Sequence, residues 1–136
     1  MRYVNSIILL ALSIVALNVQ AVTVIVHPSN ANALNKKTFK KIFLGKSKKF
    51  PDGSQVIPID LTGGNARNQF LDSVIGKSES QLKAYWSKLI FTGKGQAPKS
   101  VDTEAEVVKL VSQNPNLIGY ISDGAVDDTV KVAAKF

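Results

Sequence analysis

One segment combines two glycines, a helix-capping side chain and an arginine, and these residue types could bind an anion. The segment reads TGGNARNQF, Thr62–Phe70, and it lies between an apolar run and a predicted helix. Free backbone N–H groups and the helix dipole favour an anion at such a point, and the guanidinium of Arg67 could add a fork of donors. Glycine followed by an asparagine cap is also how an ordinary loop enters a helix. Local chemistry leaves both interpretations open.

Other residues that could do chemistry are few. The chain has no cysteine, and its single histidine, His27, stands beside a proline without a sequence-visible partner. Asp102, Glu104 and Glu106 lie near a predicted helix start, where carboxylates favour the helix dipole without any ligand. The sequence therefore predicts a non-enzymatic protein with no metal site and no cofactor.

The first residues have the pattern of a secretory signal peptide. Residues 1–21 have a basic start at Arg2, continue with an apolar run over Ile7–Leu17 and end in the small residue Ala21. The apolar run is too short for a bilayer-spanning helix, which takes about 20 residues. We expect cleavage after Ala21, a single domain over residues 22–136 and a periplasmic location.

Positive charge is concentrated in one short segment of a chain whose formal net charge is +7. A basic patch often binds nucleic acid, but an exported protein seldom meets it, and no aromatic stacking platform is interleaved here. A solvated helix face, or a docking surface for an acidic partner or a membrane, are the remaining interpretations. The lysines concerned are Lys36, Lys37, Lys40, Lys41, Lys46, Lys48 and Lys49.

The elements that must position these residues alternate along the chain. Val22–Val26 is a β-branched run of the kind buried in a parallel sheet, and capping residues with apolar periodicity mark the helices. An α/β sheet with helices on its faces is the economical architecture. Strands are predicted over Val22–Val26, Val56–Ile59, Leu117–Ile121 and Val126–Ala133, and helices over Asn35–Leu44, Ala66–Ile75, Ser78–Leu89 and Thr103–Asn114.

Three segments resemble, in order and spacing, the phosphate-binding proteins of phosphate ABC transporters. They are LNKKTFKKIFLGK (Leu34–Lys46), VIPIDLTGGNARNQF (Val56–Phe70) and LVSQNPNLIGYIS (Leu110–Ser122). The resemblance implies the type-2 periplasmic binding-protein fold, here as a single lobe with a central mixed sheet flanked by helices.

The anion loop of that family typically reads arginine, aspartate, any residue, glycine, serine, glycine, threonine, arginine. Gly63 and Arg67 match this pattern, whereas one basic group and both hydroxyls are missing. Each hydrogen bond to a charged ligand is worth about 1.5–3 kcal/mol. Without these three groups, a site of about micromolar affinity would bind no better than about millimolar. The departures fall at Asp60, Leu61, Gly64, Asn65 and Ala66.

The resemblance and the residues together predict a non-catalytic solute-binding-protein-like domain. It would bind phosphate, sulfate or a similar small anion weakly, or serve as an accessory to phosphate uptake. An ABC transporter permease or another periplasmic protein would be its partner, and two copies could rebuild a two-sided cleft. The alternative is a protein-interaction module that docks through its lysine-rich face or the Phe91–Pro98 loop. The predicted ligand-binding residues are Thr62, Gly63, Gly64, Asn65, Ala66, Arg67 and Ser29.

Overall fold

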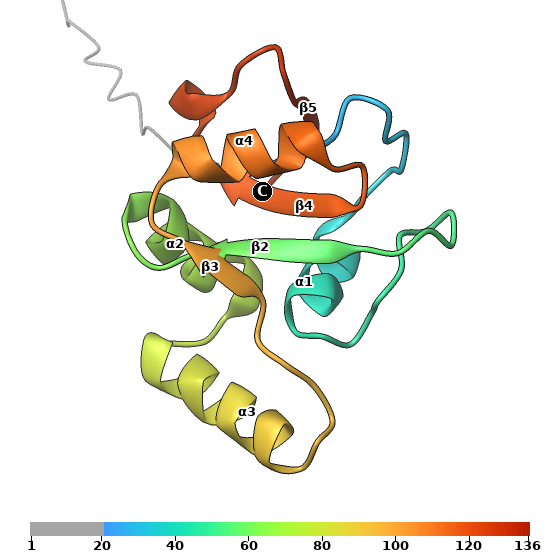
Figure 1. The fold of residues 1–136 in the computed structure, drawn as a ribbon. Coiled ribbons are helices and arrows are strands. Elements are labelled where there is room, and N and C mark those ends of the chain that lie inside the picture. The colour runs from blue at the N-terminus through green and yellow to red at the C-terminus, as the bar shows by residue number, and fades with distance from the viewer. Residues whose placement is uncertain (1–20) are drawn as a thin grey trace, which may run out of the picture.

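The computed structural model describes residues 21–136, so the predicted signal peptide lies outside the described residues except for Ala21. Five strands, one more than predicted, form one mixed sheet, and the predicted arrangement of a mixed sheet flanked by helices is confirmed (Figure 1). The strands are β1 (Thr23–Val26), β2 (Ile57–Leu61), β3 (Lys99–Val101), β4 (Leu117–Ile121) and β5 (Lys131–Lys135), in the order β3-β2-β4-β1-β5.

Strand direction divides the sheet into two halves. β2 pairs in parallel with both β3 and β4, whereas β1 pairs antiparallel with β4 and β5. The expectation that Val22–Val26 belongs to a parallel sheet was wrong. All four residues of β1 are buried, as a parallel strand would require. The cause of this burial is the interior place of β1 between β4 and β5 and the cover on both faces, which do not depend on strand direction.

The first helix forms as its capping and periodicity predict. Asn35 accepts a hydrogen bond from the backbone N of Thr38 (2.8 Å) and caps α1 (Lys36–Phe43). Phe39, Ile42 and Phe43 are buried on one face of this helix, so its lysines lie on the other. Gly45 follows the helix with a φ of +71°, a conformation that favours glycine.

The helix predicted after the glycine loop forms in two parts. α2 (Asn65–Phe70) continues into the π-helical turn η1 (Leu71–Ile75), and Gly76 ends it with a φ of +68°. The next helix, α3 (Glu79–Phe91), opens with the predicted capping box, in which Ser78 and Gln81 exchange hydrogen bonds. α3 extends two residues beyond the predicted end at Leu89.

The C-terminal third contains the largest departures from the predicted elements. The edge strand β3 was not predicted, because three residues are too few to give a periodic signal. The strand predicted over Val126–Ala133 was wrong at its start: a 3-10 turn, η2 (Asp123–Ala125), comes first, and β5 begins at Lys131. Between them the Asp127 carboxylate accepts from the backbone N of Thr129 (2.9 Å), which closes a turn.

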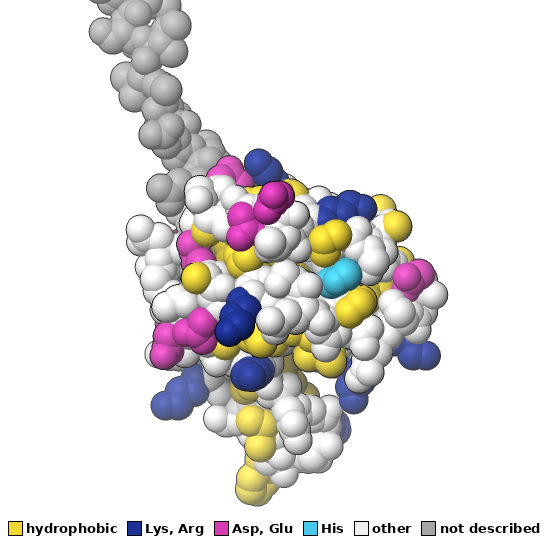
Figure 2. Space-filling model, turned by 45° about the horizontal axis from the view of Figure 1, so that its top comes forward, with side chains coloured by type: hydrophobic (Ala, Val, Ile, Leu, Met, Phe, Trp, Pro, Cys, Tyr) yellow, Lys and Arg dark blue, Asp and Glu magenta, His cyan; other side chains and the backbone are white. Residues whose placement is uncertain are grey.

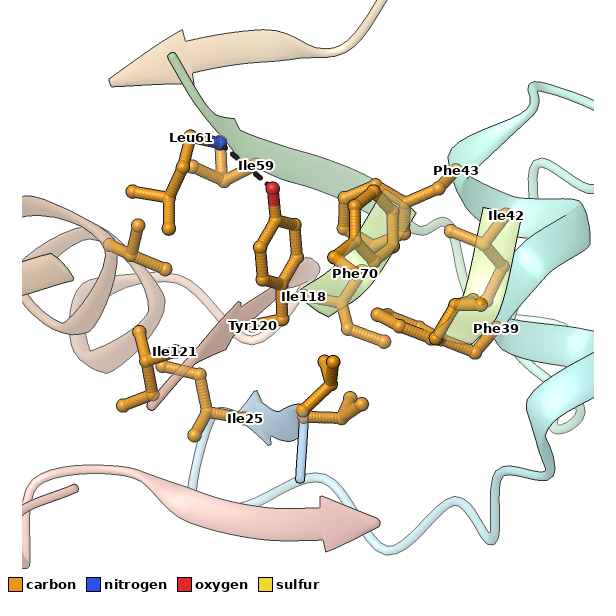
Figure 3. Close-up of a cluster of buried hydrophobic side chains, with 14 of the residues drawn as sticks. Ile25, Phe39, Ile42, Phe43, Ile59, Leu61, Phe70, Ile118, Tyr120 and Ile121 are labelled. Carbon is orange, nitrogen blue, oxygen red and sulfur yellow. Dashed lines mark hydrogen bonds between the residues drawn. The ribbon is translucent and has the colours of Figure 1, made fainter. Parts of the chain in front are cut away.

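The two faces of the sheet are covered by different helices. Figure 1 shows α4 (Glu104–Gln113) on one face and α1 and α2 on the other, while α3 projects beyond the sheet. Consecutive residues of β4 point to opposite faces. Tyr120 stacks on Phe70 (4.1 Å between ring centroids) in an aromatic cluster with Phe39 and Phe43 (Figure 3). In residues 21–136 no helix is long and apolar enough to cross a membrane.

Candidate functional site

A hollow of about 600 Å³ lies at the carboxyl edge of the parallel strands. Because β2, β3 and β4 run in the same direction, the loops that follow them meet at one edge of the sheet. Open α/β sheets bind ligands in the crevice outside the carboxyl ends of their strands. The lining residues from these loops and from the start of α4 are Gly63, Gly64, Asn65, Ala66, Asp102, Glu104, Ser122, Asp123 and Gly124.

The glycine loop contributes backbone groups to this hollow. Gly64 is the N-cap of α2 with a φ of +93° and supplies no capping side chain. The first backbone bond of the helix runs from Asn68 N to Gly64 O (3.1 Å). The N–H groups of the first helical turn have no acceptor within the helix, and those of Asn65 and Ala66, at the wall of the hollow, have none among residues 21–136.

Both hydroxyls among the predicted ligand-binding residues bond to other side chains. The Oγ1 of Thr62 donates to Asp102 Oδ1 (3.0 Å), beside the hollow. Ser29 Oγ lies 2.7 Å from Nδ1 of His27, in the turn that follows β1, and does not line the hollow. The structure therefore brings the four loop residues Gly63–Ala66 together and leaves Ser29 apart from them.

Arg67 faces away from the hollow. Its Nε and Nη2 donate to the two carboxylate oxygens of Glu79 (2.6 and 2.9 Å), and its Nη1 donates to Leu61 O (2.9 Å). The same Nη1 lies 2.9 Å from Asp60 Oδ1. The hydrogen bonds from Arg67 lower the pKa of Glu79, and those to Glu79 raise the pKa of Arg67. The sequence expectation placed this guanidinium beside a bound anion, whereas the structure gives it two carboxylate partners in a second, smaller hollow.

Asp60 is the buried centre of a polar cluster. Its carboxylate accepts from the hydroxyl of Tyr120 and from the backbone N of Leu61 (2.8 Å). That N also lies 3.4 Å from the Tyr120 hydroxyl oxygen (Figure 3). Burial, followed by the charge of Asp60, raises the pKa of Tyr120 well above its usual range. A carboxylate inside the apolar run VIPIDL is a signal that could have found this cluster from the sequence.

Three carboxylates line the main hollow: Asp102 and Glu104, which the sequence analysis placed at a helix start, and Asp123. Glu104 accepts from the backbone N and the Oγ of Ser122 (2.8 Å each), and Asp102 accepts from Thr62. Asp123 accepts from the Thr23 hydroxyl and lies 3.3 Å from Lys135 Nζ. Hydrogen bonding from Thr23, and then Lys135, lowers the pKa of Asp123. These charges oppose the binding of a fully ionised anion. Within residues 21–136, no group of three or more side chains is arranged to hold a metal ion.

The fold is that of a periplasmic-binding-protein-like domain, with a mixed sheet, flanking helices and a hollow at the carboxyl edge. Searches with protein-family models and among curated proteins each returned no match. The chain is similar to an ABC-type phosphate transport receptor from Vibrio cholerae, with a TM-score of 0.63, 16% identity and coverage of 83% of this chain and 45% of the receptor.

A second similar structure is a putative phosphate ABC transporter substrate-binding protein with bound phosphate from Clostridium perfringens. Its TM-score is 0.63, with 22% identity over 83% of this chain and 44% of that protein. PstS from Borrelia burgdorferi gives a TM-score of 0.53 and 20% identity over 77% of this chain and 41% of PstS. The chain spans less than half the length of each protein. At these identities the likeness establishes a phosphate-binding-protein-like fold.

Proposed function

We propose that residues 22–136 form a non-catalytic, periplasmic binding-protein-like domain that takes a small oxyanion weakly, with phosphate favoured. The observation that carries the proposal is the Gly63–Ala66 turn, whose free amides adjoin the hollow at the carboxyl edge of the sheet. Amides at a helix start interact favourably with negative charge. The similar solved structures, one with bound phosphate, support the choice of ligand class.

Two features of the site support a weak affinity. Arg67 is paired with Glu79 and Asp60 and adds no charge to the hollow. Asp102, Glu104 and Asp123 line it with negative charge, of which only Asp123 lies beside a lysine. A dissociation constant on the order of millimolar corresponds to about 4 kcal/mol of binding free energy, which a few backbone hydrogen bonds at an open surface can supply.

The lining carboxylates favour phosphate over sulfate. An ionised carboxylate only accepts hydrogen bonds. Phosphate keeps at least one proton at neutral pH and can donate it to Asp102 or Glu104, whereas sulfate has none to donate. Sulfate therefore meets the repulsion of these carboxylates without a compensating hydrogen bond.

The test is a titration with phosphate and with sulfate at equal ionic strength, followed by amide NMR spectra. We expect phosphate to shift the amide signals of Gly63–Ala66 with a dissociation constant of about 1–10 mM. Sulfate at the same concentration should shift these signals less. Lower pH should strengthen phosphate binding, because the more protonated ion carries less charge and has more donors. The proposal is overturned if these amides do not respond to about 50 mM phosphate, a concentration that would populate such a site by mass action.

Replacing one lining carboxylate tests its part in selectivity. Asp102→Asn keeps an acceptor for Thr62 and removes one negative charge from the hollow. We expect the variant to bind sulfate about threefold to tenfold more tightly than the parent does, as loss of one nearby charge at an exposed site predicts. The difference in affinity between phosphate and sulfate should therefore become smaller. Glu106→Gln is the matched control, because Glu106 lies in the same helix start outside the lining. Equal responses of the two variants would exclude this role for Asp102.

The biological role that follows is accessory to phosphate uptake. The partner would be an ABC transporter permease or another periplasmic protein, and a second copy of the chain would give the hollow an opposite wall. The alternative function, a protein-interaction module, is favoured by one observation: Lys36, Lys37 and Lys41 are all exposed on the outer face of α1.

A further inference from the structure

The two most exposed large hydrophobic side chains of the described residues are neighbours at the end of α3. Phe91 is 93% exposed and Ile90 is 55% exposed. They lie on the projecting helix of Figure 1, and Figure 2 shows hydrophobic side chains at that lower end of the molecule with no acidic side chain beside them. Exposed apolar side chains that gather at one place mark interaction sites.

The two chain segments that meet at this end carry only positive charge. The segment Ser80–Val101 contains four lysines and no acidic residue, and the segment Val22–Pro51 contains seven lysines and no acidic residue. The fold joins these segments at a groove of about 520 Å³, lined by Lys48 from one and by Ile90 and Lys94 from the other. An anionic surface therefore complements this end of the molecule.

Three backbone carbonyls at the end of α3, those of Lys88, Leu89 and Ile90, already have hydrogen-bond donors. Two of these carbonyls accept in a Schellman motif: Lys94 N donates to Leu89 O (2.9 Å) and Gly93 N donates to Ile90 O (3.1 Å). Thr92 donates to Lys88 O through both its N (3.1 Å) and its Oγ1 (2.9 Å). A carbonyl without a donor would oppose transfer into an apolar medium. Each of these three carbonyls has a donor, so this cost does not apply to them.

We propose that the end of α3, the α3 tip (Lys88–Lys94), binds the surface of an anionic lipid bilayer, with Phe91 and Ile90 inserted at the interface. Lys88 and Lys94, which precede and follow Ile90 and Phe91 in the sequence, are exposed and can reach lipid phosphates while their stems lie along the apolar residues. A bilayer fits the observations better than a protein, since two side chains at a projecting end offer little of the roughly 800 Å² that each partner buries in a stable protein interface. The α3 tip shares no residue with the hollow of the proposed function, so the two proposals stand independently.

The test is co-sedimentation with vesicles of phosphatidylcholine alone and with one quarter phosphatidylglycerol, using the chain as recovered after export. We expect binding only to the anionic vesicles, weakened by 0.5 M salt. Phe91→Ser should weaken it about tenfold, in line with losing the transfer of one large apolar side chain. Val132→Thr is the matched control, since it removes a less exposed apolar side chain elsewhere. Lys88→Glu with Lys94→Glu should abolish the preference for anionic lipid, whereas Lys109→Glu should leave it.

A site-specific label makes the test independent of any other membrane contact, because the chain has no cysteine. Phe91→Cys carrying an environment-sensitive fluorophore should show blue-shifted, brighter emission with anionic vesicles, while the same label at Asp128→Cys should not change. The proposal is overturned if the label at position 91 stays in water when vesicles are present. It is also overturned if that label responds only to an added protein, since the α3 tip would then be a protein interface.

Discussion

At the scale of single residues, Arg67 shows how a partner decides what a charged side chain does. Its guanidinium is held between buried Asp60 and the largely exposed Glu79, and its donors are used there. A buried charge whose partner is removed is strongly destabilising. Arg67 therefore contributes to stability. Anion binding in the hollow would depend on backbone amides and not on this guanidinium.

The pKa of Glu79 gives a prediction at this scale. Hydrogen bonding to Arg67 lowers that pKa in the folded state. Its contribution to stability is therefore present above the unfolded pKa of about 4.3 and is lost as pH falls through the lower folded pKa. Glu79→Gln should reduce the free energy of unfolding at pH 7 by about 1 kcal/mol, since the carboxylate is largely exposed.

The difference between parent and Glu79→Gln should shrink toward pH 3, as measured by urea denaturation at both pH values. Asp128→Asn serves as control, because Asp128 is exposed and makes no side-chain hydrogen bond or ion pair within residues 21–136. A Glu79→Gln effect of the same size at pH 3 and pH 7 would contradict the ion-pair explanation.

At the scale of elements, the packing of α4 on β4 depends on one glycine. An added Cβ at Gly119 would lie 2.5 Å from Val107 Cγ1 and 3.6 Å from Val111 Cγ2, and both valines are fully buried. Short branched side chains in a packed interface cannot move aside without moving the helix. The absence of a side chain at Gly119 therefore sets the distance between helix and sheet.

Gly119→Ala should lower the free energy of unfolding by about 1–3 kcal/mol, the usual cost of overpacking a core. The measurement is denaturant unfolding by circular dichroism. Gly95→Ala is the matched control: an added Cβ there meets nothing within 4 Å, and the backbone of Gly95 is not in the left-handed region. Loss of glycine flexibility in the unfolded chain would stabilise both variants, so equal destabilisation by both substitutions would exclude the contact with Val107 as the cause.

At the scale of the whole molecule, acidic side chains gather at one place on the surface and lysines at others. Acidic residues line the hollow at the carboxyl edge, and lysines cover α1 and the groove beside the α3 tip. Such a distribution steers anionic partners to one part of the surface and away from another. The molecule thus offers two basic faces that can be tested separately.

The lysine face of α1 is the docking surface of the alternative function. Lys37→Glu with Lys41→Glu should weaken capture of an acidic protein partner and flatten its salt dependence, while thermal stability stays nearly unchanged because both side chains are exposed. The measurement is affinity capture over a range of salt concentrations, with Lys109→Glu as control. If capture is unaffected by the double reversal, the interaction module loses its main support.

The sequence by itself determined those features that depend on neighbours along the chain. Asn35, Ser78 and Thr103 cap their helices, and Gly45 and Gly76 end theirs, because capping needs only residues three or four positions apart. The fold class also followed from the sequence. The alternation of strands and helices and the resemblance to phosphate-binding proteins can both be recognised from the residues alone. The signal peptide stays a prediction.

Only the tertiary structure decided which partner each polar side chain finds. Residue types showed that Arg67 stands beside the glycine loop, but Glu79 is twelve positions away and meets it through the path of the chain after η1. The direction of β1, the short edge strand β3 and the meeting of Asp102, Glu104 and Asp123 at one hollow likewise depend on strand order. Long-range pairing is set by the packing of the whole core, and local sequence patterns do not predict it.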